Sequence, residues 1–133
     1  MKEATGDFKR LEQILMQTNG AIDVYSGDDL SACEWMLAGA KGVISVTANV
    51  APKHMAKLCD MTIDKDEANC LKFNDKLMPL HSILFTESNP IPVKWALHRL
   101  GLINDEIRAP LTRYSTQYHS QMDNILTELD ILA

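Results

Sequence analysis

Apolar and β-branched residues follow two different spacings in the first third of the chain. Between residues 8 and 18 they recur every three or four positions, which predicts a helix that Asp7 caps and that stops near Gly20. Residues 21–25 and residues 43–47 form short runs with the composition of strands buried on both faces. These runs predict two strands separated by a helix-forming stretch.

The segments between and after these runs carry helix-start signals. The turn SGDD places Asp28 and Asp29 before a helix predicted over residues 30–37, and either aspartate can cap it. Pro52 lies in the first turn of another predicted helix, for which Asn49 is the expected cap. Strand and helix therefore alternate, which predicts parallel strands joined by right-handed crossovers.

The strand patterns stop near residue 64, so we expect an α/β domain of residues 1–64 and a helical domain of residues 65–133. The helical pattern over residues 66–85 contains Pro79, which should kink the helix or divide it in two. Two further helices are predicted over residues 93–100 and 115–129.

Two architectures fit strand-and-helix units followed by helices. One is a small open parallel sheet, and the other is the closing part of an eight-stranded β/α barrel with a helical appendage. A three-stranded sheet with two unpaired edges offers unsatisfied backbone groups to any neighbour. We therefore expect the sheet to continue in a partner.

The composition narrows the class of protein. At 133 residues, with 46% hydrophobic and 23% charged residues, the chain is long enough for a buried core. Its net charge of -5 and scattered basic residues argue against nucleic acid or an anionic membrane as a partner. No apolar run approaches the ~20 residues that span a bilayer, and we expect a cytoplasmic protein.

Residues with metal-binding or redox chemistry are few and dispersed. Cys33, Cys59 and Cys70 show no C-x-x-C pairing, so neither a disulfide framework nor a zinc site is indicated, and we expect buried or half-buried thiols. The four histidines lack H-x-x-x-H spacing, which favours surface or helix-packing roles. The sequence has no glycine-rich phosphate loop. We therefore expect no metal and no cofactor.

Four segments carry a resemblance that covers essentially the whole chain. They are KEATGD at residues 2–7, YSGDD at 25–29, GVISVTANVAP at 42–52 and SNPIPVKWAL at 88–97. Together they resemble the C-terminal part of the bacterial dihydrodipicolinate synthase (4-hydroxy-tetrahydrodipicolinate synthase) family, a class I aldolase-type group of lyases. The related N-acetylneuraminate lyases share the lysine strand but lack the NPIPVKWAL segment, which makes the resemblance specific.

The resemblance implies a fold and a reaction. Residues 1–64 would be the last strand-helix units of a β/α (TIM) barrel, from the end of its sixth strand, and residues 65–133 a C-terminal three-helix domain. The family condenses pyruvate with L-aspartate 4-semialdehyde in lysine (diaminopimelate) biosynthesis. The lysine of its K-[ED]-A-T-G motif, Lys2 here, forms a Schiff base with pyruvate. Without the resemblance, Lys2 would be interpreted as a frayed, solvated residue.

Two substrate-binding residues are implied by the same matching. Gly27, in the turn after the seventh strand, would line the cleft, because a missing side chain lets substrate approach the backbone. Ile44, on the eighth strand, would pack beside the imine and help keep its pocket dry. Both fall at the carboxyl ends of strands, where barrel active sites are built.

The family's remaining active-site residues precede the lysine. They are the paired threonines that hold the pyruvate carboxylate, the tyrosines that relay protons and the arginine that meets the semialdehyde. We therefore expect the isolated chain to be inactive, and its partners to be copies of itself in a homo-oligomer or a complementing N-terminal half. The alternative is a catalytically inactive fragment that acts as an interaction or assembly module.

Overall fold

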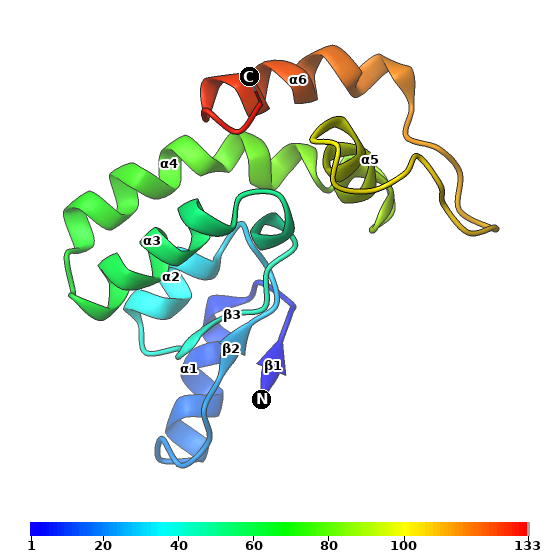
Figure 1. The fold of residues 1–133 in the computed structure, drawn as a ribbon. Helices are drawn as coiled ribbons and strands as arrows, with labels where there is room; N and C mark the ends of the chain where they lie inside the picture. Colours follow the sequence, from blue (N-terminus) through cyan, green and yellow to red (C-terminus); the bar gives the residue numbers. More distant parts are fainter. Residues whose placement is uncertain (133) are drawn as a thin grey trace.

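A small sheet and a larger set of helices make up residues 1–132, the part of the chain that the computed structural model describes (Figure 1). In chain order the elements are β1 (Lys2–Glu3), α1 (Phe8–Gln17), β2 (Tyr25–Ser26), α2 (Ala32–Leu37), β3 (Gly42–Val43), the 3-10 helix η1 (Thr47–Asn49), α3 (Pro52–Ile63), α4 (Glu67–Ile83), α5 (Ile91–Arg99), the 3-10 helix η2 (Thr116–Tyr118) and α6 (His119–Glu128).

The strands form one parallel sheet in the order β1-β2-β3. Lys2 lies opposite Tyr25, and Tyr25 lies opposite Gly42. The prediction of parallel strands that alternate with helices is therefore confirmed. The chain is rich in helices and has a small three-stranded sheet, which is compatible with part of an α/β fold.

Both predicted strands are longer than the observed ones. The prediction of a strand over residues 21–25 is wrong for its first four residues, since β2 is Tyr25–Ser26. A strand extends only as far as its neighbours pair with it, and β1 beside it has only two residues. The length of β2 is thus set by the ladder and not by its own composition.

The prediction of a strand over residues 43–47 is wrong beyond Val43, where β3 ends. The carboxylate of Asp29 accepts hydrogen bonds from the backbone N–H groups of Val46, at 2.8 Å, and Thr47, at 3.1 Å. Backbone donors that a side chain holds are no longer free to join a strand ladder. The chain therefore turns into η1 directly after the strand.

Two predicted helix starts are confirmed and two are wrong. Asp7 caps α1, because its side chain accepts a hydrogen bond from the N–H two residues on, and Pro52 begins α3. The N-cap of α2 is Ser31 and not an aspartate, and that of α3 is Ala51 and not Asn49. The aspartates of the SGDD turn instead hold the turns at the end of the sheet.

The long helix α4 runs through a proline. Pro79 was predicted to kink the segment or to divide it, and the second alternative is wrong, since α4 is continuous from Glu67 to Ile83. Leu77 and Leu80, on either side of the proline, are fully buried. A fully buried leucine stabilises by about 1.5–3 kcal/mol, so the pair offsets a proline penalty of about 3 kcal/mol.

The two predicted C-terminal helices are confirmed as α5 and α6, with η2 forming the turn that leads into α6. Arg99 of α5 pairs with Asp123 of α6, with its Nε 2.8 Å from Oδ1 and its Nη2 3.2 Å from Oδ2. This two-point contact joins the last helices of the chain.

Helices are layered on one side of the sheet (Figure 1). α2 packs against β2 and β3, α3 and α4 pack against α2, and α6 packs on α4. One buried cluster joins α1, α2 and the segments before β2 and β3, the second joins α2, α3 and α4, and the third joins α4, α5 and α6 to the segment after η1. We call residues 1–64 the sheet part and residues 65–132 the helical part. Two of these clusters draw residues from both sides of position 64, so the two parts are packed together.

The cysteines lie in the interior, as predicted. Cys33 of α2 and Cys70 of α4 are fully buried, with their sulfur atoms 3.0 Å apart, and Cys59 is half-buried. Burial raises the pKa of the Cys33 and Cys59 thiols. The thiols therefore act as small apolar groups at the contact between the helices.

Candidate functional site

The exposed face of the sheet carries the predicted lysine. Side chains alternate between the two faces of a strand. Val24 is buried in one cluster with Leu11 of α1 and Trp35 of α2, so the side chain of its neighbour Tyr25 points to the opposite face of the sheet. Lys2 is opposite Tyr25 in the register, and both residues are exposed. The Lys2 side chain therefore projects from the open face of the sheet.

Gly27 makes room for the Lys2 side chain. A Cβ added to Gly27 would lie 2.5 Å from Lys2 Cε and 2.6 Å from the Cβ of Ala4, both too close for any real contact. The Gly27 N–H donates to the Glu3 carbonyl at 2.7 Å, which keeps the two segments in register. The structure thus brings Lys2 and Gly27 into contact at the carboxyl end of the sheet, and the gap above the glycine holds the lysine stem.

Ile44 lies at the same end of the sheet. Its N–H donates to the Ser26 carbonyl at 2.8 Å, directly after β3. Ile44 is two residues beyond Gly42, which is opposite Tyr25, so strand alternation places it on the face of Lys2. Its side chain is 51% exposed. All three predicted site residues therefore share one face and one end of the sheet.

The arrangement presents a primary amine beside an apolar side chain on an open surface. Within residues 1–132, the side chain of Lys2 takes part in no ion pair. A lysine amine attacks a carbonyl carbon only in its neutral form, which burial in an apolar pocket favours. Nucleophilic attack by the Lys2 amine therefore requires further protein groups that cover this face of the sheet.

The structure brings together three buried polar residues near this end of the sheet that sequence analysis did not group. Asp29, Thr47 and His81 are 1%, 0% and 0% exposed. Asp29 bonds the backbone of Val46 and Thr47, and the Thr47 hydroxyl lies 2.7 Å from Nδ1 of His81. Burial lowers the pKa of His81, and the carboxylates of Asp29 and Asp28 partly oppose this effect. Asp29 and Thr47 lie in two of the segments that carry the resemblance, but no spacing motif groups them with His81, so only the fold reveals their contact.

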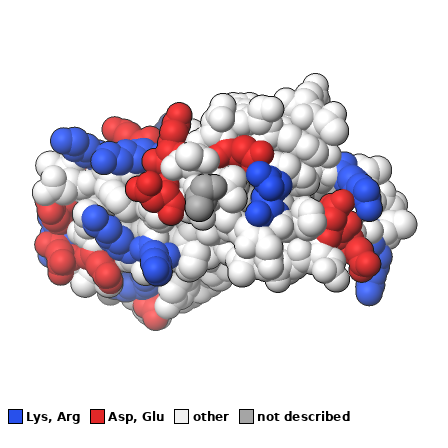
Figure 2. All heavy atoms as spheres, turned by 45° about the horizontal axis from the view of Figure 1, so that its top comes forward, with Lys and Arg blue, Asp and Glu red and all other residues white. Residues whose placement is uncertain are grey.

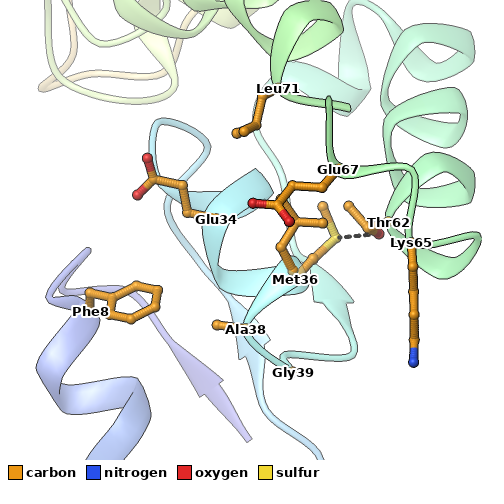
Figure 3. Close-up of a pocket in the computed structure, with 10 residues that line it drawn as sticks. Phe8, Glu34, Met36, Ala38, Gly39, Thr62, Lys65, Glu67 and Leu71 are labelled. Carbon is orange, nitrogen blue, oxygen red and sulfur yellow. Dashed lines mark hydrogen bonds between the residues drawn. The ribbon is translucent and has the colours of Figure 1, made fainter. Parts of the chain in front are cut away.

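An open pocket of about 890 Å³ lies away from the predicted site residues (Figure 3). Phe8 of α1, Met36 of α2 and Leu71 of α4 contribute to its lining, together with the junction between α3 and α4. Neither Lys2 nor the other predicted residues line it. The pocket is therefore formed between helices and is distinct from the candidate site on the sheet.

Within residues 1–132, neither charge nor metal-ligand chemistry points to a second candidate centre. Acidic and basic side chains are interspersed on the face shown in Figure 2. In the described part of the chain, no three His, Cys, Asp or Glu side chains gather into a group that could hold a metal ion. None of the helices within residues 1–132 combines the length and the apolar character needed to cross a bilayer.

Comparison with known proteins identifies relatives along the whole chain. The sequence profile of the Dihydrodipicolinate synthetase family matches residues 1–129. The chain is 58% identical over 132 residues to the 4-hydroxy-tetrahydrodipicolinate synthase of Legionella pneumophila, covering 99% of this chain and 46% of that protein. It is 50% identical over 133 residues to the Pseudomonas aeruginosa protein of the same name, covering 100% of this chain and 46% of that protein.

Solved structures agree with this match. The crystal structure of the chloride-inhibited dihydrodipicolinate synthase from Acinetobacter baumannii complexed with pyruvate matches with a TM-score of 0.94 at 52% identity, over 98% of this chain and 45% of that one. Dihydrodipicolinate synthase from Aquifex aeolicus matches with a TM-score of 0.93 at 35% identity, over 98% of this chain and 44% of that one. The chain spans slightly less than half the length of these relatives. It belongs to the dihydrodipicolinate synthetase family.

Proposed function

We propose that this chain supplies the imine-forming lysine of a 4-hydroxy-tetrahydrodipicolinate synthase, a cytoplasmic class I aldolase-type lyase of lysine biosynthesis. Residues 1–64 are the last strand-helix units of its β/α barrel, and residues 65–133 form its C-terminal helical domain. The names of the relatives support the proposal, as does the structural neighbour that was solved with pyruvate.

The placement of Lys2 is the single observation that carries the proposal. Its side chain extends over Gly27 on the open face of the sheet, at the carboxyl end of parallel strands. Ligands of parallel α/β sheets and barrels bind at this end. An amine at this position is therefore where a Schiff-base enzyme of this architecture needs one.

In the proposed reaction, the neutral amine of Lys2 adds to the C2 carbonyl carbon of pyruvate and water leaves, giving an imine. The pyruvate methyl group loses a proton, and the resulting enamine carbon attacks the aldehyde carbon of aspartate semialdehyde, whose oxygen takes up a proton. The amino group of the semialdehyde then attacks the imine carbon. The ring closes, the bond between that carbon and the Lys2 nitrogen breaks, and the free amine is restored.

Gly27 and Ile44 have supporting roles in this proposal. Gly27 leaves the space through which the lysine stem reaches the end of the sheet. Ile44 offers an apolar surface that excludes water from the imine once the face is covered. The cover comes from a complementing N-terminal segment or from other copies in a homo-oligomer. Without it, positioning and proton-transfer groups are lacking, and each is worth orders of magnitude in rate.

Complementation tests the proposal. The chain is mixed with the segment of the Legionella pneumophila relative that precedes the matched part, and the condensation of pyruvate with aspartate semialdehyde is followed. We expect turnover in the mixture and none in either part alone. Lys2→Arg should abolish turnover, whereas Lys41→Arg, at an exposed lysine before β3, should retain it. Turnover by the Lys2→Arg mixture would exclude Lys2 as the imine-forming residue.

An interaction module is the second candidate function. Within residues 1–132, the outer edges of β1 and β3 pair with no further strand. Unpaired edges of parallel strands are templates for strands of a partner. A mixture that forms a stable complex by size-exclusion chromatography, yet shows no turnover, would support the module and contradict the catalytic proposal.

A further inference from the structure

We infer that His81 is a positioning residue for the candidate site. Through Thr47 it anchors the loop that begins at Ile44 to α4, while Asp29 anchors the same loop to the turn that contains Gly27. The hydrogen-bond geometry by itself supports the anchoring. Its consequence for catalysis rests on the proposed function, in which Ile44 borders the imine.

The loop after β3 is held first from the sheet side. Asp29 lies two residues beyond Gly27, and its Oδ2 accepts hydrogen bonds from the N–H groups of Val46 at 2.8 Å and Thr47 at 3.1 Å. These donors stand at the start of η1, where backbone N–H groups have no partner within the helix. One carboxylate oxygen thus connects the turn after β2 to the loop after β3.

The same loop is held a second time from the helical part. Nδ1 of His81, in α4, lies 2.7 Å from the Thr47 hydroxyl. The Thr47 carbonyl accepts hydrogen bonds from the N–H groups of Val50, at 3.0 Å, and Ala51, at 2.9 Å. Bonds from the sheet, from the helical part and from the loop itself therefore meet at Thr47.

The energetics indicate that these bonds serve geometry more than stability. Oδ1 of Asp29 and Nε2 of His81 are buried, and neither has a hydrogen-bond partner among the described residues. A buried polar atom without a partner destabilises a fold, and apolar side chains of the same shape would avoid that cost. What such side chains cannot supply is a directional bond that selects one conformation of the loop.

The protonation of the ring fits this role. Burial lowers the pKa of His81, so the imidazole stays neutral near pH 7 even though Asp29 and Asp28 are close. A neutral ring and a hydroxyl can bond in either direction, because each group can donate or accept. The contact with Thr47 is thus maintained without a buried charge.

Three variants separate positioning from packing. His81→Leu removes Nδ1 but keeps a buried side chain of similar size, and His81→Asn keeps a nitrogen near the position of Nδ1. Thr86→Val is the matched control, because the Thr86 hydroxyl bonds the Tyr114 hydroxyl at 2.8 Å, at a different contact of the helical part. Amide hydrogen exchange of Val46 and Thr47 is measured by NMR on the chain of residues 1–133.

We expect His81→Leu to speed exchange at Val46 and Thr47 by about tenfold, the effect of losing one hydrogen bond. His81→Asn should restore most of the protection, and Thr86→Val should leave both amides unchanged. Amides in the middle of α6 should exchange at the wild-type rate in all variants. Unchanged exchange at Val46 and Thr47 in His81→Leu would overturn the inference, as would equally fast exchange in His81→Asn.

A second measurement ties the loop to the reaction. In the complemented mixture, the rate at which borohydride traps pyruvate on Lys2 should fall about tenfold in His81→Leu and recover in His81→Asn. If His81→Leu speeds amide exchange in the loop but leaves the trapping rate unchanged, His81 anchors the loop without positioning the site, and the inference is overturned. If the wild-type mixture traps no pyruvate at all, the proposed function fails, and the exchange data still decide whether His81 anchors the loop.

Discussion

The sheet part and the helical part of the chain differ in how completely they bury their apolar side chains. Of the eleven large hydrophobic side chains that are exposed in the described residues, eight lie in residues 1–64 and three lie beyond. The eight are Met1, Phe8, Met16, Ile22, Tyr25, Leu30, Ile44 and Ile63. Two of the eight, Tyr25 and Ile44, lie on the open face of the sheet beside Lys2. Adjacent exposed apolar side chains mark sites of interaction, so this face of the sheet part is the one suited to receive a cover.

The helical part exposes fewer large apolar side chains, because its helices pack on one another and on the sheet part. α4, α5 and α6 share one buried cluster, and α5 and α6 are also joined by an ion pair. The candidate site combines the two parts, because its lysine lies on the open sheet while its loop is bonded to α4. The comparison teaches that the candidate site residues lie on the open sheet, while hydrogen bonds to α4 fix the loop beside them.

The largest expected effect contrasts the same kind of truncation in the two parts. Leu80→Ala, at a fully buried position of α4, should lower the free energy of unfolding by about 2–5 kcal/mol. Ile44→Ala, on the open face, should change it by less than about 0.5 kcal/mol. Urea unfolding followed by circular dichroism measures both. Equal losses would contradict the contrast between the parts.

A smaller effect, also within the sheet part, concerns the placement of the Lys2 amine and not the stability of the fold. Gly27→Ala places a Cβ against the Lys2 stem and Ala4, and a shift of the amine by about 1 Å should slow trapping of pyruvate by about a hundredfold.

Gly20→Ala is its control, because Gly20 has a φ of +70° and open space around it. It should destabilise the chain by about 1–2 kcal/mol and leave trapping in the folded mixture unchanged. Trapping that is as fast in Gly27→Ala as in Gly20→Ala would show that the contact between Gly27 and Lys2 does not place the amine.

The smallest effect is a pH dependence that originates at His81. Because the pKa of His81 is lower in the folded chain, the unfolded chain binds more protons once the pH falls through about 6.5. Stability should therefore be fully present above that pH and should fall below it, by at most about 1.4 kcal/mol per pH unit. Urea unfolding between about pH 5 and pH 8 should show this component in the wild type and not in His81→Leu. Parallel curves for the two proteins would contradict a neutral, buried ring.

Helix positions could be predicted from the sequence because they depend on local spacing. Apolar residues three and four apart define α1, and a proline in the first turn defines the start of α3. Strand ends could not be predicted in the same way. The end of β3 depends on a carboxylate 17 residues upstream, which takes the N–H of Val46 out of the ladder.

The candidate site was predictable to the extent that each of its residues lies in a short motif. Lys2, Gly27 and Ile44 follow from segments that resemble the family, and the sheet register then puts them on one face. The contacts among the buried residues behind them were not predictable. Thr47 is 18 positions from Asp29 and 34 from His81, and only the packed fold brings the three together.

Covalent trapping of pyruvate is the most direct measurement of the central claim, that Lys2 is the imine-forming amine. The complemented mixture is treated with pyruvate and borohydride, digested and sequenced by tandem mass spectrometry. We expect a reduced adduct on Lys2 that is absent from Lys2→Arg and far weaker in the chain alone. A complex that forms but carries its adduct on another lysine, or none at all, would contradict the claim.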